Sequence, residues 1–129
     1  MTSASVEGRK FRAVLTWVCW LQALAVLVQG TLAGGFLSGM DSAVRQHEIG
    51  GWVTFSLALV QVGMVFFRPA DVYGLWLRIS SVTMVLADSL QLGSGYGRFS
   101  QVHIPLAVLI VGGLTWQILW IAQNRTTTE

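Results

Sequence analysis

Four long runs of apolar residues, separated by short polar segments, fill most of the chain. They cover about residues 13–37, 47–67, 72–92 and 103–122. Each run has close to the roughly 20 apolar residues that a helix needs to cross the hydrocarbon core of a membrane. The pattern therefore predicts four transmembrane helices in one membrane domain that comprises residues 1–129.

The connections between these runs are short, which makes consecutive helices antiparallel. We therefore expect an all-α integral membrane protein whose fold is an antiparallel up-down four-helix bundle. Most basic residues fall at one end of this bundle, namely Arg9, Lys10, Arg12, Arg68 and Arg125. By the positive-inside rule, both termini are expected in the cytoplasm and the protein in the cell membrane, such as the inner membrane of a bacterium.

The composition supports a membrane location. Apolar residues make up 53% of the chain and charged residues 11%, which is about half the usual charged share. Tryptophan and glycine are also abundant, as in many membrane helices. The net charge of +2 is small and concentrated at the N-terminus, so nucleic acid is not expected as a partner. The lone Cys19 lies in an apolar run and is expected to be a buried small side chain.

The only two histidines, His47 and His103, stand at the starts of the second and fourth runs. In an up-down bundle these two helices are diagonal and parallel, so both histidines lie near the outer face. With neighbouring axes about 8–10 Å apart, the diagonal is roughly 11–14 Å. We expect this gap to be too wide for contact between the imidazoles, and to suit an iron porphyrin with one imidazole on each side. The simpler alternative is that each histidine is only a polar residue at a helix end.

The residues around the histidines fit a flat ligand. Glycines one turn beyond His47 would leave room for a macrocycle, and the fourth helix offers apolar residues of modest size. Two arginines at the outer edge would bind haem propionates. These candidate cofactor-binding residues are Gly50, Gly51, Thr54, Ala107, Arg45 and Arg98.

A glutamine stands fourteen residues beyond each histidine, Gln61 on the second run and Gln117 on the fourth. Both lie close to the face of their histidine and at equal depth. We expect their side chains to hydrogen-bond across the bundle, as polar side chains in membranes commonly do.

Three segments resemble the haem A synthase family. They are the first run over residues 21–35 (LQALAVLVQGTLAGG), the pair Gln46-His47, and residues 102–107 (VHIPLA). Full-length members contain two four-helix halves, each with a histidine pair near the outer face, so this chain resembles a single half. The resemblance implies that His47 and His103 are the axial ligands of a b-type haem, and that two copies pair to mimic the two-half protein.

The chain departs from the family at positions that matter for catalysis. The active half of the family has a glutamate three residues before the histidine of the second helix, whereas Val44 stands there in this chain. The nearest acid is Glu48, and the cysteine pair often found in the first outer loop of the family is absent. The resemblance therefore implies haem binding more strongly than it implies synthase activity. Whether the protein is an enzyme stays open.

Asp88 lies inside the third and least apolar run. A carboxylate at membrane depth is costly and is by default a candidate functional residue. One interpretation is an acid that relays protons or lies at the haem edge, which makes Asp88, with Glu48, a candidate catalytic residue. The other is a packing residue that is satisfied by Gln29 and by serine or threonine hydroxyls.

Three hypotheses for the function follow. The first is a membrane b-type cytochrome for electron transfer or haem handling, with lipids, a quinone or a membrane redox protein, and a second copy of itself as partners. The second is a small oligomeric transporter or channel that uses Asp88. The third is an accessory subunit of a larger membrane complex. Two small-residue motifs, Gly30-xxx-Gly34 and Gly35-xxx-Gly39, are expected to pack inside the bundle, and a dimer contact is the alternative.

Overall fold

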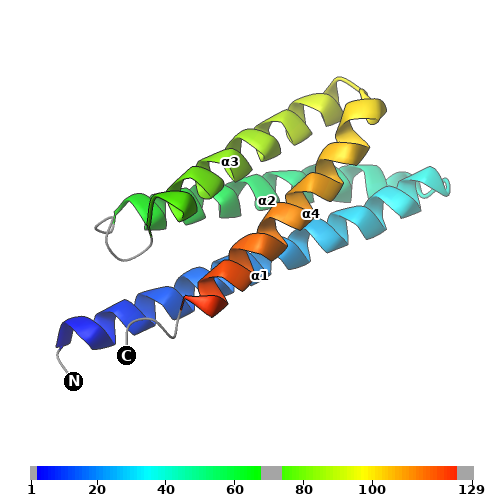
Figure 1. The fold of residues 1–129 in the computed structure, drawn as a ribbon. Coiled ribbons are helices and arrows are strands. Elements are labelled where there is room, and N and C mark those ends of the chain that lie inside the picture. The colour runs from blue at the N-terminus through cyan, green and yellow to red at the C-terminus, as the bar shows by residue number, and fades with distance from the viewer. Residues whose placement is uncertain (1–2, 68–73, 125–129) are drawn as a thin grey trace.

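A computed structural model describes residues 3–67 and 74–124, and all of the regular structure in them is helical. Four helices follow one another along the chain (Figure 1). Their bounds are α1 Ser3–Leu37, α2 Asp41–Phe66, α3 Gly74–Tyr96 and α4 Ser100–Gln123.

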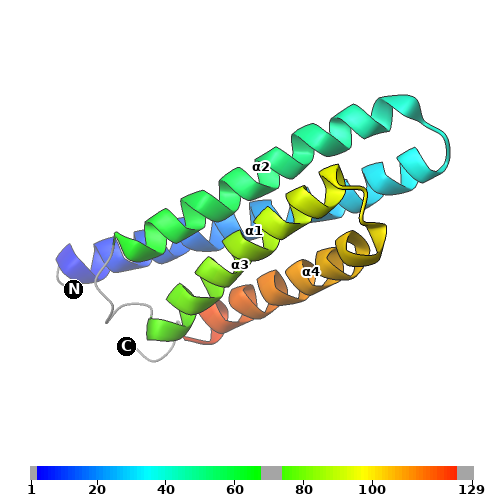
Figure 2. The same ribbon diagram turned by 90° about the horizontal axis from the view of Figure 1, so that it is seen from above.

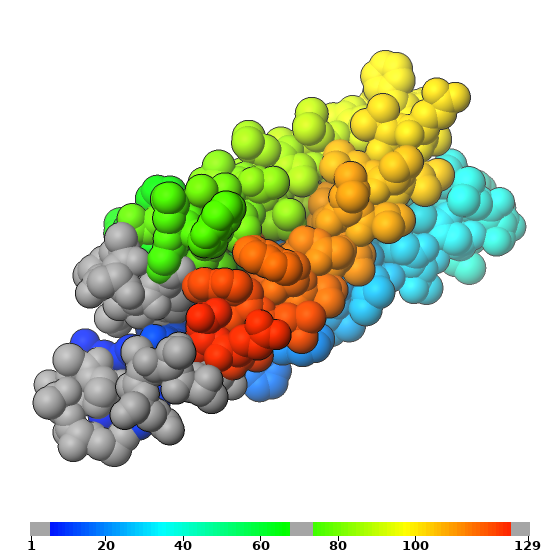
Figure 3. Space-filling view, in the orientation of Figure 1, coloured from blue at the N-terminus to red at the C-terminus, as the bar shows by residue number. Residues whose placement is uncertain are grey.

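The four helices run alternately up and down, as expected from the short connections (Figures 1 and 2). Helices α1 and α2, α2 and α3, α3 and α4, and α1 and α4 are packed as neighbours, so α2 and α4 are diagonal. The space-filling view shows α4 lying across one face between α3 and α1 (Figure 3). The end of the bundle with the α1–α2 and α3–α4 turns is called the histidine end below, and the opposite end the terminal end.

The two turns at the histidine end have the same backbone pattern. After α1, the Met40 N–H donates to the Gly35 carbonyl and the Gly39 N–H to the Phe36 carbonyl, with Gly39 at φ +90°. After α3, the Phe99 N–H donates to the Ser94 carbonyl and the Arg98 N–H to Gly95, with Arg98 at φ +58°. This is the Schellman pattern, in which a left-handed residue ends the helix and satisfies its last carbonyls. The chain is thus made of two hairpins that turn in the same way.

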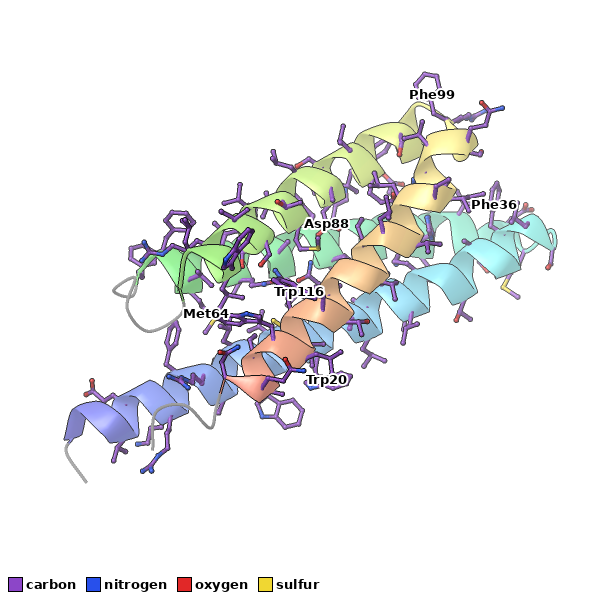
Figure 4. All side chains as sticks on the ribbon, in the orientation of Figure 1. Trp20, Phe36, Met64, Asp88, Phe99 and Trp116 are labelled. Carbon is purple, nitrogen blue, oxygen red and sulfur yellow. The ribbon has the colours of Figure 1, made fainter. Side chains whose placement is uncertain are left out.

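Three helices, α1, α2 and α4, are long and apolar enough to span a membrane. Their outward-facing side chains are largely apolar, and Figure 4 shows Trp20 and Phe36 at the periphery of the bundle. Leu24, Val108 and Leu109 are each more than half exposed. Such a surface is typical of a protein surrounded by lipid rather than by water.

The core contains apolar clusters and a set of buried polar side chains. Near the terminal end, one cluster is formed by Leu15, Cys19, Val65, Leu77, Ile118 and Ile121. Met84, Ile110 and Leu114 form a second cluster further along the bundle. The burial predicted for Cys19 is confirmed, since its side chain is fully covered.

The inner face of α3 is unusually polar. Its buried residues are Leu77, Ser81, Met84, Asp88 and Ser94. This explains why α3 is the least apolar of the four helices: its polar side chains are turned toward the bundle and its apolar ones outward. The arrangement is the reverse of an amphipathic helix in a soluble protein.

The helices extend beyond the predicted spans, because apolar runs mark only the part of a helix suited to lipid. The segment Ser38–Gln46, expected to be a polar link, is already helical from Asp41, so His47 lies in the second turn of α2 rather than at its mouth. The predicted packing of Gly30 and Gly34 inside the bundle is wrong, because a Cβ added at either would meet nothing within 4 Å. Arg68 and Arg125, two of the basic residues used to orient the bundle, lie outside the described residues.

Candidate functional site

His47 and His103 face each other from the diagonal helices α2 and α4. Their ring centroids are 5.9 Å apart and the ring planes make an angle of 61°. The expectation that the gap is too wide for contact is therefore wrong. It neglected the reach of the side chains, which extends to roughly 5–6 Å from each helix axis and closes most of the diagonal distance.

Each imidazole is held by a backbone carbonyl of the preceding helix. The Nδ1 atom of His47 lies 3.1 Å from the Gln29 carbonyl oxygen, and Nδ1 of His103 lies 2.9 Å from that of Gln91. Because a carbonyl oxygen can only accept, Nδ1 carries the ring proton in both histidines. In the neutral rings Nε2 is therefore left with a free lone pair. This is the arrangement by which proteins orient a histidine that ligates a metal.

The two rings fit the donor set of a bis-histidine iron. With iron–nitrogen bonds of about 2 Å on both sides, the ring centroids of two axial imidazoles lie about 6 Å apart. Among the described residues, no group of three or more histidine, cysteine, aspartate or glutamate side chains comes together. A bare metal ion would thus find two protein ligands here, whereas an iron porphyrin brings its other four ligands with it.

The space beside His47 is occupied by protein side chains. The Gln29 side chain lies directly on Gly50, where a Cβ would overlap its amide nitrogen, and Leu92 lies 3.1 Å from a Cβ built at Gly51. The room predicted over these glycines is therefore filled. Gln29 also lines a groove of about 430 Å³ between α1 and α2, together with Val28 and Val53.

The third predicted residue of this face, Thr54, is buried and donates from its hydroxyl to the Gly50 carbonyl at 3.0 Å. On α4, Ala107 is half-buried beside Leu106, which packs on the second core cluster with Ile110. These residues form the floor beneath the histidines.

Gly95 and Ser94 hold His103 from the side of α3. A Cβ built at Gly95 would lie 3.1 Å from Cε1 and 3.3 Å from Nδ1 of the His103 ring. The Ser94 hydroxyl lies 3.3 Å from the same Nδ1 and donates to the Gln91 carbonyl at 3.1 Å. Neither residue was expected to take part from the sequence, because the contact depends on how far α3 continues beyond its apolar run.

Arg45 and Arg98 are exposed at the histidine end, as predicted, on α2 and in the α3–α4 turn. Glu48 is exposed as well and accepts a hydrogen bond from the Tyr96 hydroxyl at 2.7 Å, while Trp52 Nε1 donates to the same hydroxyl at 3.0 Å. Glu48 thus links α2 to α3 at the surface and points to a structural role.

The predicted contact between Gln61 and Gln117 is confirmed. The Gln61 amide donates to Oε1 of Gln117 at 2.9 Å, and both side chains are fully buried. The same Gln61 amide reaches the Ser81 hydroxyl at 3.1 Å, and the Gln117 amide donates to that of Ser80 at 2.9 Å. A polar layer therefore joins α2, α3 and α4 between the two core clusters.

Asp88 is buried, and its partner is a residue that the sequence did not single out. The Gln22 amide donates to Oδ2 of Asp88 at 2.9 Å, from α1 to α3. Asp88 is 3% exposed and Gln22 is fully covered. The partnership expected with Gln29 is not found, because Gln29 lies on Gly50 instead. The tilt and depth of α1 relative to α3 decide which glutamine lies beside Asp88. The positions of the apolar runs in the sequence determine neither of these quantities.

Comparison with protein-family models, with curated proteins and with solved structures gives no match for this chain.

Proposed function

We propose that this protein is a membrane b-type haem protein in which His47 and His103 are the axial ligands, and that it acts in electron transfer or haem handling. The observation that carries the proposal is the facing pair of imidazoles, 5.9 Å between centroids, each with Nδ1 on a backbone carbonyl. The resemblance of three segments to the haem A synthase family supports it, and the chain would correspond to one half of such a protein.

The residues of the site have separate tasks in this proposal. The Gln29 and Gln91 carbonyls bind Nδ1 of the two rings, which leaves Nε2 of each ring as the proposed iron ligand. Gly50 would offer backbone surface to the haem only after the Gln29 side chain that now covers it has moved. Arg45 and Arg98, both exposed at the histidine end, are the proposed partners of the propionates. When bound, the haem supplies one-electron chemistry, and the apolar residues beneath it exclude water.

The proposed membrane arrangement has all four helices across the bilayer and both termini in the cytoplasm. It is supported by the apolar surface of α1, α2 and α4 and by the basic residues Arg9, Lys10 and Arg12 near the start of α1. The histidine end then lies at the outer leaflet, where a lipid-soluble quinone or a membrane redox protein can approach it.

The test is a visible spectrum of the protein purified in mild detergent, supplied with haemin and then reduced with dithionite. Wild-type protein should show the sharp α-band of a low-spin, six-coordinate haem. His47→Ala and His103→Ala should each lose that band. Gln46→Ala is the matched control, because Gln46 is an exposed polar neighbour of His47 and should leave the spectrum unchanged.

A wild-type protein that stays colourless after adding haemin would refute the proposal. So would histidine variants that retain the wild-type spectrum, since another residue would then be the ligand. Binding that is lost equally in Gln46→Ala would show that the effect lies in folding and not in ligation.

The buried Asp88 also favours a second candidate, a small transporter driven by protons. It differs from the haem protein in one measurable respect. In a transporter, Asp88→Asn abolishes proton-coupled flux across proteoliposomes, while His47→Ala and His103→Ala retain it.

A further inference from the structure

The buried carboxyl of Asp88 has no role in ligating a haem, yet the helix that carries it leads to the histidines. Asp88, Gln91 and Ser94 follow one another at intervals of three residues along α3, so they lie near one face. Gln91 and Ser94 are the residues that hold His103. From Asp88 to Ser94 the rise is about 9 Å. Polar residues therefore stand at intervals of about one turn along α3 between the carboxyl and the histidine end, and they are called the polar track below.

Two buried amide oxygens along this track lack a hydrogen-bond donor. Within the described ranges 3–67 and 74–124, Oε1 of Gln22 and Oε1 of Gln91 are buried without a partner. Both atoms accept hydrogen bonds. Each would therefore be satisfied by a donor, such as a protonated carboxyl group or a water molecule. Gln22 is the residue that donates to Asp88. A proton on Asp88 would give this pair the donor that it lacks.

Toward the terminal end the track is closed by apolar side chains. Met84 lies one turn before Asp88 on the inner face of α3 and packs with Ile110 and Leu114. Beyond that cluster come the Gln61–Gln117 layer and then the first core cluster. Among the described residues, an apolar cluster thus separates Asp88 from the terminal end, whereas polar residues follow it along α3 toward the histidine end.

Within residues 3–67 and 74–124, the recorded side-chain partner of Asp88 carries no charge. Its hydrogen-bond partner on α1 is the neutral Gln22, and Cys19 lies one turn further toward the terminal end. The titratable groups on the inner faces of α2 and α4 are His47 and His103, at the other end of the track. On α3 the nearest charge is Arg78, ten residues before Asp88. The change of charge that would affect Asp88 most is therefore the reduction of the proposed haem between His47 and His103.

We propose that Asp88 is the proton-accepting group of this protein, which takes up a proton from the histidine end as an electron arrives between His47 and His103. This inference rests on the proposed haem site. A haem held by His47 and His103 would take up one electron, for which a membrane quinol would be the reductant in the cell. One proton from water forms an O–H bond on the Asp88 carboxylate, so the net charge inside the bundle does not change.

The driving force is electrostatic. Inside an apolar bundle the effective dielectric is low, and salt does not screen two groups that share it. An added electron raises the affinity of a neighbouring carboxylate for a proton. By reciprocity, a bound proton makes the electron easier to add. The midpoint potential of the haem should therefore fall as the pH rises.

The experiment is a redox titration of the haem-loaded protein at several pH values, followed by the α-band, with dithionite as reductant. Wild-type protein is compared with Asp88→Asn, which keeps the size of the side chain but cannot take up a proton. Asp41→Asn is the matched control, because Asp41 is an exposed aspartate at the start of α2. We expect a midpoint potential that falls with pH in wild type and Asp41→Asn, and that loses most of this dependence in Asp88→Asn. Equal slopes in all three proteins would overturn the proposal.

Infrared spectroscopy gives a second readout that does not depend on the haem. A protonated Asp88 should contribute a carboxyl C=O band that shifts in D2O and is missing in Asp88→Asn. Absence of such a band at every pH overturns the proposal. If the protein binds no haem but shows this band, the proposed function and the redox link fall together, and the proton site at Asp88 stands.

Discussion

His103 donates from Nδ1 to the backbone carbonyl of Gln91 at 2.9 Å, and this bond decides which ring nitrogen is free. His47 repeats the relationship with Gln29 in the other hairpin. In both cases the acceptor belongs to the backbone, so no substitution of the glutamine side chain removes it. The orientation of both imidazoles is thus built into the packing of consecutive helices.

Gly95→Ala should weaken haem binding by pushing the His103 ring. The new Cβ would lie 3.1 Å from Cε1, closer than most Cβ contacts, and the ring cannot retreat without lengthening its bond to Gln91. Changes to the groups that support a metal ligand typically cost about 10-fold or more in affinity. Haemin titration followed by absorbance measures the effect. Gly93→Ala on the same helix is the control, since its Cβ would meet nothing within 4 Å.

Gln61→Leu and Gln117→Leu should each destabilise the protein by about 1 kcal/mol, the size of a hydrogen bond between membrane helices. Each change leaves the amide group of the other glutamine buried with one hydrogen bond fewer. The double variant should lose less than the sum of the two, because no amide is then left unpaired. Unfolding in SDS followed by circular dichroism gives the three free energies. Additive losses would mean that the two side chains do not interact.

Asp88→Asn should fold at least as stably as wild type. An asparagine still accepts from the Gln22 amide and adds an N–H group that can reach the unpaired Gln22 oxygen, a gain of up to about 1 kcal/mol. Asp88→Leu should instead cost about 1–3 kcal/mol, because both polar atoms of Gln22 are then buried without partners. The same SDS unfolding assay compares the two variants. A severe loss of stability in Asp88→Asn would contradict this account of the pair.

Cys19 should resist thiol reagents in the folded protein and react once the bundle opens. Its side chain is fully covered within the first core cluster. Labelling with a maleimide in mild detergent should be slow and should become rapid after adding SDS. As the chain has a single cysteine, the labelled fraction reports unfolding directly. Rapid labelling before SDS is added would show that this cluster is open.

The sequence predicted the features that depend on periodicity alone. The positions of His47 and His103 at one end, and the Gln61–Gln117 contact, follow from counting residues along two parallel helices. It failed where the answer depends on the tilt and depth of helices against one another. The partner of Asp88 was assigned to Gln29 instead of Gln22 for that reason. The room over Gly50 was misjudged because the side chain that fills it comes from another helix.

Helix α3 carries polar side chains on its inner face, so by itself it does not partition readily into a bilayer. An aspartate near the centre of a membrane helix adds roughly 2.5–3.5 kcal/mol to the free energy of insertion, and α3 is not among the helices apolar enough to span unaided. Gln22, which pairs with Asp88, belongs to α1 and is synthesised first. In the proposed membrane arrangement, the hydrogen-bond donor for Asp88 is therefore synthesised before α3, and this order of the helices would favour insertion of the least apolar one.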